Sequence, residues 1–164
     1  MKHIKVLVVF TLIINLFNGY GQEKKTYKVN TVAFYNVENL FSVEDDEFTV
    51  YQDRNPRGEG FYSQEVYEKK LENLAKVISE IGADVTGNPP AIVGFCEVEN
   101  RKVIEDLLNQ EPLLKSDYGI IHYHSPDRRG IDVALIYQKK LFVPTNSQSR
   151  ELQLYSNNDV TQRI

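Results

Sequence analysis

The amino-acid sequence predicts an α/β fold in which a sheet is shielded by helices. Three features predict it: a strand-like run at residues 29–35, a helical repeat of apolar residues over 63–81, and a continuous apolar run at 91–96. Strands and helices that alternate along a chain are typical of this class. A length of 164 residues fits about one domain.

The first strand and the first helix are predicted from local composition. Residues 29–35 are rich in β-branched and aromatic side chains, and residues 36–41 would form the exit from this strand. Residues 42–62 carry acidic residues and then Asn, Pro and Gly, which is the composition of a loop. Ser63 suits the N-cap of a helix that ends at Gly82. Its buried face would be formed by apolar residues at helical spacing, which are Tyr67, Leu71, Leu74, Ile78 and Ile81.

The second half of the chain is predicted to complete the sheet. The run at 91–96 suits a strand that is buried on both faces. Asn100 could cap a short second helix around residues 103–108. The other predicted strands are 118–124, 131–137 and 141–143. Beyond about residue 146 the sequence shows no recognisable closing element.

The first 21 residues have the layout of a secretory signal peptide. Lys2 and Lys5 precede an apolar run at 6–17, and small residues stand before a cleavage point at Gln22. The apolar core is shorter than the roughly 20 residues of a membrane span. The sequence therefore predicts an exported protein, periplasmic or secreted, with no stable membrane insertion after cleavage. The alternative is an uncleaved N-terminal anchor.

Charge and cysteine content exclude several classes of protein. The formal net charge is −4 at pH 7, which argues against a protein that coats nucleic acid through a basic face. It does not exclude an enzyme that meets a phosphate through a metal ion. Cys96 is the only cysteine, so no intramolecular disulfide can form and no cysteine-based zinc site is expected. Its place in an apolar run is typical of an inert buried thiol.

Candidate metal ligands stand at the ends of two predicted strands. Glu97 directly follows the buried run, and Asn36 and Glu38 follow the first strand. Open α/β sheets bind ligands at the edge where these strands end, and carboxylate and amide oxygens suit Mg²⁺. The alternative for Glu97 is an acidic residue before the helix capped by Asn100, where the helix dipole favours a negative charge.

Three other groups of polar residues have both a functional and a simpler interpretation. His122 and His124 alternate on one strand face and could chelate a metal, but an ordinary exposed or half-buried face is the favoured interpretation. Arg128 and Arg129 could clamp a phosphate or could be solvated turn residues. The acidic residues 44–47 could bind calcium, but their spacing lacks the EF-hand pattern, which favours a solvated loop.

Three stretches of sequence form a specific combination. They are residues 34–41 (FYNVENLF), 94–100 (GFCEVEN) and 127–137 (DRRGIDVALIY). In this order, with a helix between the first two, they resemble the endonuclease/exonuclease/phosphatase superfamily, the DNase I-like metal-dependent phosphoesterases. The resemblance covers about residues 29–140. It implies a four-layer α/β/β/α sandwich and hydrolysis of a phosphoester by an activated water.

The resemblance also implies roles for individual residues. Glu97 corresponds to the main metal-ligand glutamate, and Asn36 to an asparagine that helps hold the metal or the scissile phosphate. Glu38 falls where some relatives carry a second acidic residue, which would be a further metal ligand. Arg129 and Asp132 would lie near the site, with Arg129 close to the phosphate. The implied cofactor is Mg²⁺, with Mn²⁺ or Ca²⁺ as alternatives, and the implied partner is a phosphoester substrate, with nucleic acid as one option.

Several elements of the superfamily are not found in this sequence. The superfamily uses a histidine held by an aspartate near its C-terminus as general base, together with Gly-Asp-x-Asn and Asn-His elements, whereas no histidine follows His124. We therefore expect residues 22–164 to be the N-terminal part of the domain, with the C-terminal half absent and no activity on its own. One sheet face would then lack a partner, so the isolated segment would be poorly soluble or self-associate.

Two alternatives stay open at the level of sequence. One is a non-catalytic fragment or binding module that keeps the sheet without the chemistry. The other is a phosphatase or lipid phosphodiesterase of the same superfamily, because substrate choice resides in loops rather than in the metal site.

Overall fold

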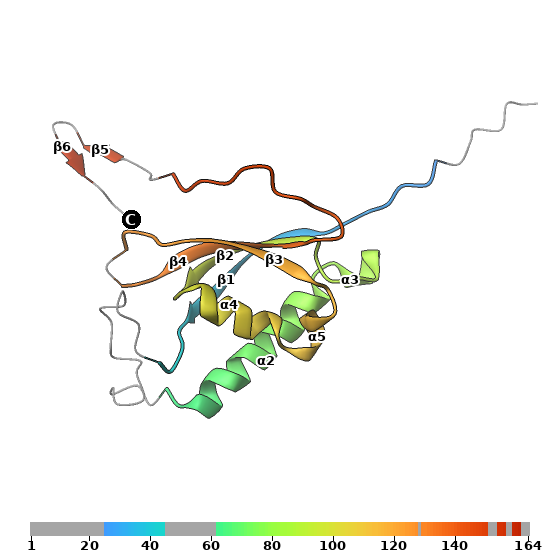
Figure 1. The fold of residues 1–164 in the computed structure, drawn as a ribbon, viewed down its shortest axis with the longest axis horizontal. Coiled ribbons are helices and arrows are strands. Elements are labelled where there is room, and N and C mark those ends of the chain that lie inside the picture. Colours follow the sequence, from blue (N-terminus) through green and yellow to red (C-terminus); the bar gives the residue numbers. More distant parts are fainter. Residues whose placement is uncertain (1–24, 45–61, 128, 151–153, 157–158, 162–164) are drawn as a thin grey trace, which may run out of the picture.

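A mixed four-stranded sheet organises the chain (Figure 1). The structure is a computed structural model that describes residues 25–44, 62–127 and 129–150, with two short strands beyond them. The strand order is β1–β2–β4–β3, in which β1 is parallel to β2 and β4 is antiparallel to both of its neighbours. The strands are β1 (Val32–Leu40), β2 (Ile92–Val98), β3 (Tyr118–Tyr123) and β4 (Asp132–Gln138). The predicted α/β class is confirmed.

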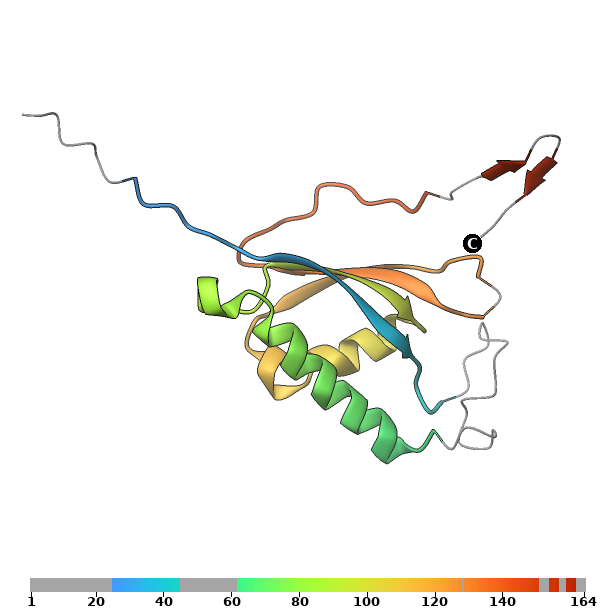
Figure 2. The same cartoon turned by 180° about the vertical axis from the view of Figure 1, so that it is seen from behind.

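The longer helices lie together on one face of this sheet (Figures 1 and 2). The helices are α2 (Gln64–Glu80), α3 (Ala83–Thr86), α4 (Arg101–Leu108) and α5 (Glu111–Leu114). Side chains between the helices and the sheet are fully buried, among them Phe95, Ile136, Ile78, Ile104 and Leu107. In the described part of the chain, no helix is long and apolar enough to cross a membrane.

The opposite face of the sheet carries exposed apolar side chains. Phe34 is 73% exposed and Val133 is 51% exposed. A separate two-stranded sheet pairs β5 (Leu154–Ser156) with β6 (Asp159–Thr161), although the sequence predicted no closing element in this region. The described residues do not confirm the four-layer sandwich, so a second sheet packed on the first stays a prediction.

Two strand assignments made from sequence are corrected by the structure. β1 does not end at residue 35, because Leu40 pairs with Val98 and is buried in the core. No strand forms at 141–143. The amides of residues 141 and 142 instead donate to the Gln138 carbonyl at 3.0 and 3.1 Å. These residues form a turn, and their amides are not available to pair with a neighbouring strand.

Some of the sequence-based predictions concern residues outside the described ranges. They are the signal peptide at 1–21, the acidic loop residues 45–47 and Arg128. These remain predictions.

Local sequence signals determine the ends of α2 and α4. Ser63 Oγ accepts the Val66 amide at 3.3 Å, and Asn100 Oδ1 accepts the Val103 amide at 3.1 Å. Both predicted N-caps are thereby confirmed. Gly82 follows α2 in a left-handed conformation with φ 68°, which is the backbone that glycine supplies after a helix.

Gly82→Ala is expected to lower the free energy of unfolding by about 1–3 kcal/mol. A Cβ at this position would strain the left-handed backbone and would also collide with the Thr31 side chain. Gly87→Ala is a matched control, because Gly87 has φ 67° but no atom within 4 Å of its added Cβ. Urea denaturation measures both variants. An equal loss in the two would show that the Thr31 contact has no energetic effect.

Candidate functional site

The parallel pair β1–β2 loses its regular register near its carboxyl end. Asn36 pairs with Cys96, but the next pair is Leu40 with Val98. Three residues of β1 therefore stand opposite the single residue Glu97 of β2. Such bulges bend a strand and redirect its side chains, and they are frequent next to active sites.

Residues 36–39 and Glu97, here called the β1–β2 bulge, have an unusual backbone. Glu38, Asn39 and Glu97 have φ values of 53°, 57° and 65°, a left-handed region that residues other than glycine rarely adopt. Each such residue costs about 1–3 kcal/mol, and strain of this kind is concentrated at functional sites. In the described part of the chain the fourth non-glycine residue with a positive φ, Asp117, precedes β3 at the other end of the sheet, so this strain is concentrated at the bulge, though not confined to it.

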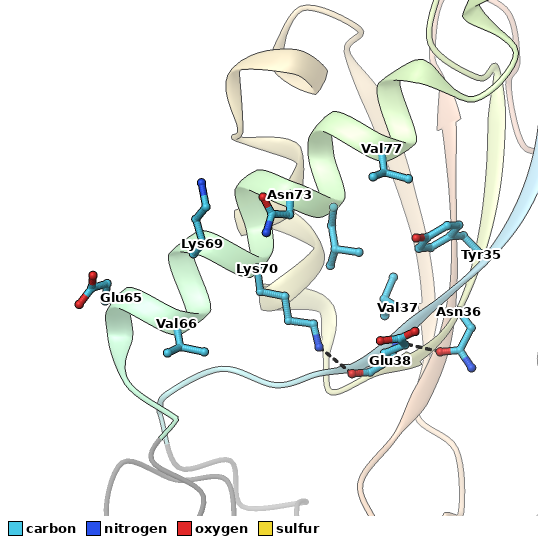
Figure 3. A pocket seen from close by; sticks show the side chains of 11 residues that line it. Tyr35, Asn36, Val37, Glu38, Glu65, Val66, Lys69, Lys70, Asn73 and Val77 are labelled. Atoms are coloured by element: carbon cyan, nitrogen blue, oxygen red, sulfur yellow. Dashed lines mark hydrogen bonds between the residues drawn. The ribbon is translucent and has the colours of Figure 1, made fainter.

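Side chains from both strands and from α2 hold the bulge in place. The Asn39 amide donates to Glu97 Oε2 at 3.2 Å, which ties the two strands together. The Glu38 amide donates to Asn36 Oδ1 at 2.7 Å (Figure 3). Lys70 Nζ reaches across from α2 and donates to the Glu38 and Asn39 carbonyls at 2.6 and 3.0 Å. These bonds stabilise a conformation that the residues would not adopt on their own.

A groove of about 680 Å³ lies between β1 and α2, beside the bulge (Figure 3). Asn36 and Glu38 line it from the strand, and Lys69 and Lys70 line it from the helix. Glu97 does not line the groove. The structure therefore brings Asn36 and Glu38 together at the groove, and it joins Glu97 to them through the backbone of the bulge.

Lys70 is a functional candidate that sequence reasoning missed. The helical pattern assigns both Lys69 and Lys70 to faces other than the apolar stripe of α2, and the acceptors that Lys70 meets are backbone carbonyls of a distant strand. In the structure Lys70 is half-buried and bonds the bulge, whereas Lys69 is exposed and pairs with Glu72 at 2.7 Å. The only sequence signal for this difference is that Lys70 is three residues after Tyr67 and four before Leu74, at the edge of the apolar stripe, whereas Lys69 lies on the opposite side of the helix.

A second polar cluster lies where β3 ends and β4 begins. His122 Nε2 and His124 Nδ1 lie 2.9 and 3.1 Å from the same oxygen, Asp132 Oδ2. The side chains of His122 and Asp132 are buried, while that of His124 is 61% exposed. The ligand atoms of these three residues lie within 4.8 Å of one another. Sequence reasoning placed the two histidines on one face but did not connect them with Asp132.

Arg129 lies in the turn between β3 and β4, where it is bound to Asp127. Its Nη2 and Nε donate to Asp127 Oδ2 at 2.6 and 3.2 Å, and its backbone amide donates to Oδ1 at 2.8 Å. The bonded guanidinium holds the pKa of Asp127 below its ordinary value. Arg129 is thus engaged within its own turn, and its contact with a phosphate stays a prediction.

Comparison with known proteins assigns the chain to a family. The model described as endonuclease/exonuclease/phosphatase family matches residues 31–164. The chain belongs to this family. Membership confirms the resemblance seen in the sequence and indicates a hydrolase of the phosphoesterase or nuclease type, a group that generally depends on a divalent metal. No curated protein and no solved structure gave a significant match.

The residues suggested by the endonuclease/exonuclease/phosphatase resemblance gather at one end of the sheet. Asn36 and Glu97 lie on adjacent strands, and Asp132 starts the next strand by pairing with Val98. The alternative role for Glu97 as a helix-start residue gains no support. Its carboxylate bonds the Asn39 amide of β1, not the helix that follows it.

Two other residues in the family stretch 94–100 have structural roles. Glu99 is only 5% exposed and accepts the Ser42 amide at 2.7 Å, which fastens the chain after β1. Burial, and after it the negative charge of Glu97, raise the pKa of the Cys96 thiol. A thiol with a raised pKa is a poor nucleophile, in agreement with the predicted inert cysteine, although Cys96 is only partly buried and not fully buried as predicted.

Proposed function

We propose that the protein is a metal-dependent phosphoester hydrolase whose divalent cation is held by Glu97, Asn36 and Glu38. The β1–β2 bulge is the observation that carries this proposal. Three of its residues have a strained left-handed backbone, and side chains from three elements hold them in it. Strain that is maintained in this way is typical of a site that positions ligands.

The donors at the bulge match the chemistry of Mg²⁺. Glu97 and Glu38 offer carboxylate oxygens and Asn36 offers an amide oxygen. Mg²⁺ is a hard cation that takes one or two protein carboxylates and completes its shell with water and phosphate oxygens. Asn36 and Glu38 are exposed, so that a substrate can reach them. Mn²⁺ and Ca²⁺ use the same kind of donor and are the alternatives.

The contribution of the protein itself is positioning. When bound, the cation would neutralise charge on the phosphoryl oxygens and lower the pKa of an attacking water. The Asn39 amide orients the Glu97 carboxylate. The Glu38 amide donates to Asn36 Oδ1, which orients the side chain so that the second acceptor site of Oδ1 can bind the cation and the NH₂ group can donate to a phosphate oxygen. Lys70 keeps the backbone of the bulge in place from α2.

Two further parts of the proposal concern the whole protein. Export is supported by the charged, apolar and small-residue segments within 1–21. A mature protein that begins at Gln22 is expected on N-terminal sequencing, and an N-terminus at Met1 would contradict export by cleavage. A second sheet over the exposed Phe34 and Val133 would give the four-layer sandwich that the family resemblance implies.

Removal of divalent metal is expected to abolish phosphoester hydrolysis by the full-length protein, because the charge on the phosphoryl oxygens would no longer be neutralised. The protein is dialysed against EDTA and then assayed on bis(4-nitrophenyl) phosphate, DNA, a phosphomonoester and a lipid phosphodiester. Addition of Mg²⁺ or Mn²⁺ should restore hydrolysis, and the preferred substrate separates a nuclease from a phosphatase or lipid phosphodiesterase. Hydrolysis that is insensitive to EDTA would contradict metal dependence. No hydrolysis of any substrate with metal present would favour the binding module.

Lys70→Met is expected to lower kcat about tenfold with a smaller change in KM, since a loosened bulge misplaces Glu97 and Asn36. Lys76→Met is the matched control, because Lys76 is an exposed lysine of α2 that neither bonds the bulge nor lines the groove. Steady-state kinetics with saturating Mg²⁺ measure both variants, and Lys70→Arg should recover part of the rate. An equal effect of the two Met substitutions would contradict a positioning role for Lys70.

A further inference from the structure

We propose that His122, His124 and Asp132 form a second cation site, distinct from the Mg²⁺ site at Glu97 and selective for a transition metal such as Zn²⁺. The three residues come from the end of β3, the residue beyond it and the start of β4. Because β3 and β4 are antiparallel and Tyr123 pairs with Val133, His124 and Asp132 lie opposite each other. His122 joins them because residues i and i+2 of a strand share a face.

The two distances to the Asp132 oxygen are close to those between the ligand atoms of a tetrahedral zinc site, and all three ligand atoms lie within 4.8 Å of one another. Zn–N and Zn–O bonds of about 2.0–2.1 Å separate the ligand atoms of a tetrahedron by roughly 3.3 Å. His122 Nε2 and His124 Nδ1 lie 2.9 and 3.1 Å from Asp132 Oδ2. The nitrogens would need to move away from this oxygen by only a few tenths of an ångström to admit an ion. Both nitrogens already point at the same oxygen.

The carboxylate of Asp132 is oriented for this role by its other oxygen. Asp132 Oδ1 accepts the Ser125 amide at 2.7 Å, and Ser125 Oγ donates to the Ile131 carbonyl at 2.7 Å. The Asp127 amide in turn donates to Ser125 Oγ at 3.1 Å. Hydrogen bonds of this kind to metal-ligating carboxylates fix their direction and support metal affinity. The β3–β4 turn therefore holds the ligand in place.

The burial of the cluster and its donor atoms favour a transition metal that keeps one coordination position open to solvent. His122 and Asp132 have side chains that are 6% and 4% exposed, while the 61% exposure of His124 leaves a path for an ion and room for water. Imidazole nitrogens suit Zn²⁺ and its neighbours in the first transition series, whereas Mg²⁺ and Ca²⁺ prefer oxygen donors. Three protein ligands with a water in the fourth position is a common arrangement for Zn²⁺.

Zinc titration in the presence of excess Mg²⁺ tests this proposal on the full-length protein. Calorimetry should show one Zn²⁺ bound, with the same affinity in Glu97→Gln, because that variant leaves the histidine cluster intact. His124→Ala should weaken zinc binding by at least about 100-fold. This is more than the usual loss on removing a residue that only hydrogen-bonds a metal ligand. His124 is exposed, and circular dichroism confirms that the variant is folded. Unchanged zinc affinity in His124→Ala, or no zinc binding by the parent protein, would overturn the proposal.

Imidazole ¹⁵N NMR gives a second test that does not depend on a variant. Two of the three histidines in the printed sequence are the proposed ligands. Zn²⁺ should shift Nε2 of His122 and Nδ1 of His124, the atoms that face Asp132. Absence of these shifts at saturating Zn²⁺ would overturn the assignment of ligands. Since the proposed hydrolase function is tested by Glu97→Gln with Mg²⁺ alone, the two proposals can fail independently.

Discussion

Glu97→Gln is expected to lower the rate of Mg²⁺-dependent phosphoester hydrolysis by about 10²–10³-fold or more, because the cation would lose the main anionic ligand proposed for it. Glutamine has nearly the same size, and its side-chain oxygen can still accept the Asn39 amide that now donates to Glu97 Oε2. The bulge should therefore keep its shape while its negative charge is lost. Initial rates across a range of Mg²⁺ concentrations measure the effect, and the variant should also require more Mg²⁺ for half-maximal activity.

Two companion variants make the Glu97 result specific. Glu80→Gln removes one carboxylate from the exposed end of α2, away from the bulge, and should leave the rate unchanged. Glu38→Gln should show a smaller loss than Glu97→Gln if Glu38 is a secondary ligand. Full activity in Glu97→Gln would remove Glu97 from the proposed site, whatever the other variants do.

Phe95→Ala is expected to lower the free energy of unfolding by about 3–5 kcal/mol. Phe95 is fully buried in β2, where it lies between Tyr35 of β1 and Ala134 of β4 in the sheet register. Small domains are stable by only about 5–15 kcal/mol, so this loss would be a large fraction of the total. Urea denaturation followed by circular dichroism measures it. A loss below 1 kcal/mol would contradict the central place of β2 in the core.

Exposed positions supply the controls for Phe95. Val85 in α3 is 73% exposed, and Val85→Ala should change the free energy of unfolding by no more than about 0.5 kcal/mol. Phe34→Ala tests whether a second sheet covers the open sheet face. Phe34 lies on that face and is 73% exposed, like Val85. A loss of several kcal/mol in the full-length protein would indicate that a second sheet covers Phe34. A negligible loss would contradict the four-layer arrangement.

Local signals made much of the fold predictable from sequence. The cap at Ser63, the helical spacing up to Ile78 and the left-handed glycine at 82 each act within a few residues of the chain. The apolar run of β2 likewise predicts a strand and the position of Glu97 at the end of the sheet, although only one face of β2 is fully buried and not both faces as predicted. These features need no knowledge of the tertiary structure, which explains why they were predicted correctly.

The parts of the site that sequence did not reveal depend on contacts between distant segments. The bulge arises from the offset between two strands that are more than fifty residues apart, as the Asn39–Glu97 bond shows. Lys70 lies at the edge of the apolar stripe of α2, but its acceptors are carbonyls of a strand about thirty residues away, which helical spacing does not reveal. Asp132 joins the two histidines through the register of β3 and β4. The run at 141–143 is apolar, but its backbone turns back to Gln138 and does not enter the sheet.

Anomalous scattering from Mn²⁺ in crystals of the full-length protein tests the central claim most directly, because it locates the cation independently of activity. We predict a peak at coordination distance from a Glu97 carboxylate oxygen, with Asn36 or Glu38 beside it. A further peak at His122 and His124 would be compatible with the second site. No peak at Glu97 under saturating Mn²⁺ would contradict the proposed metal site.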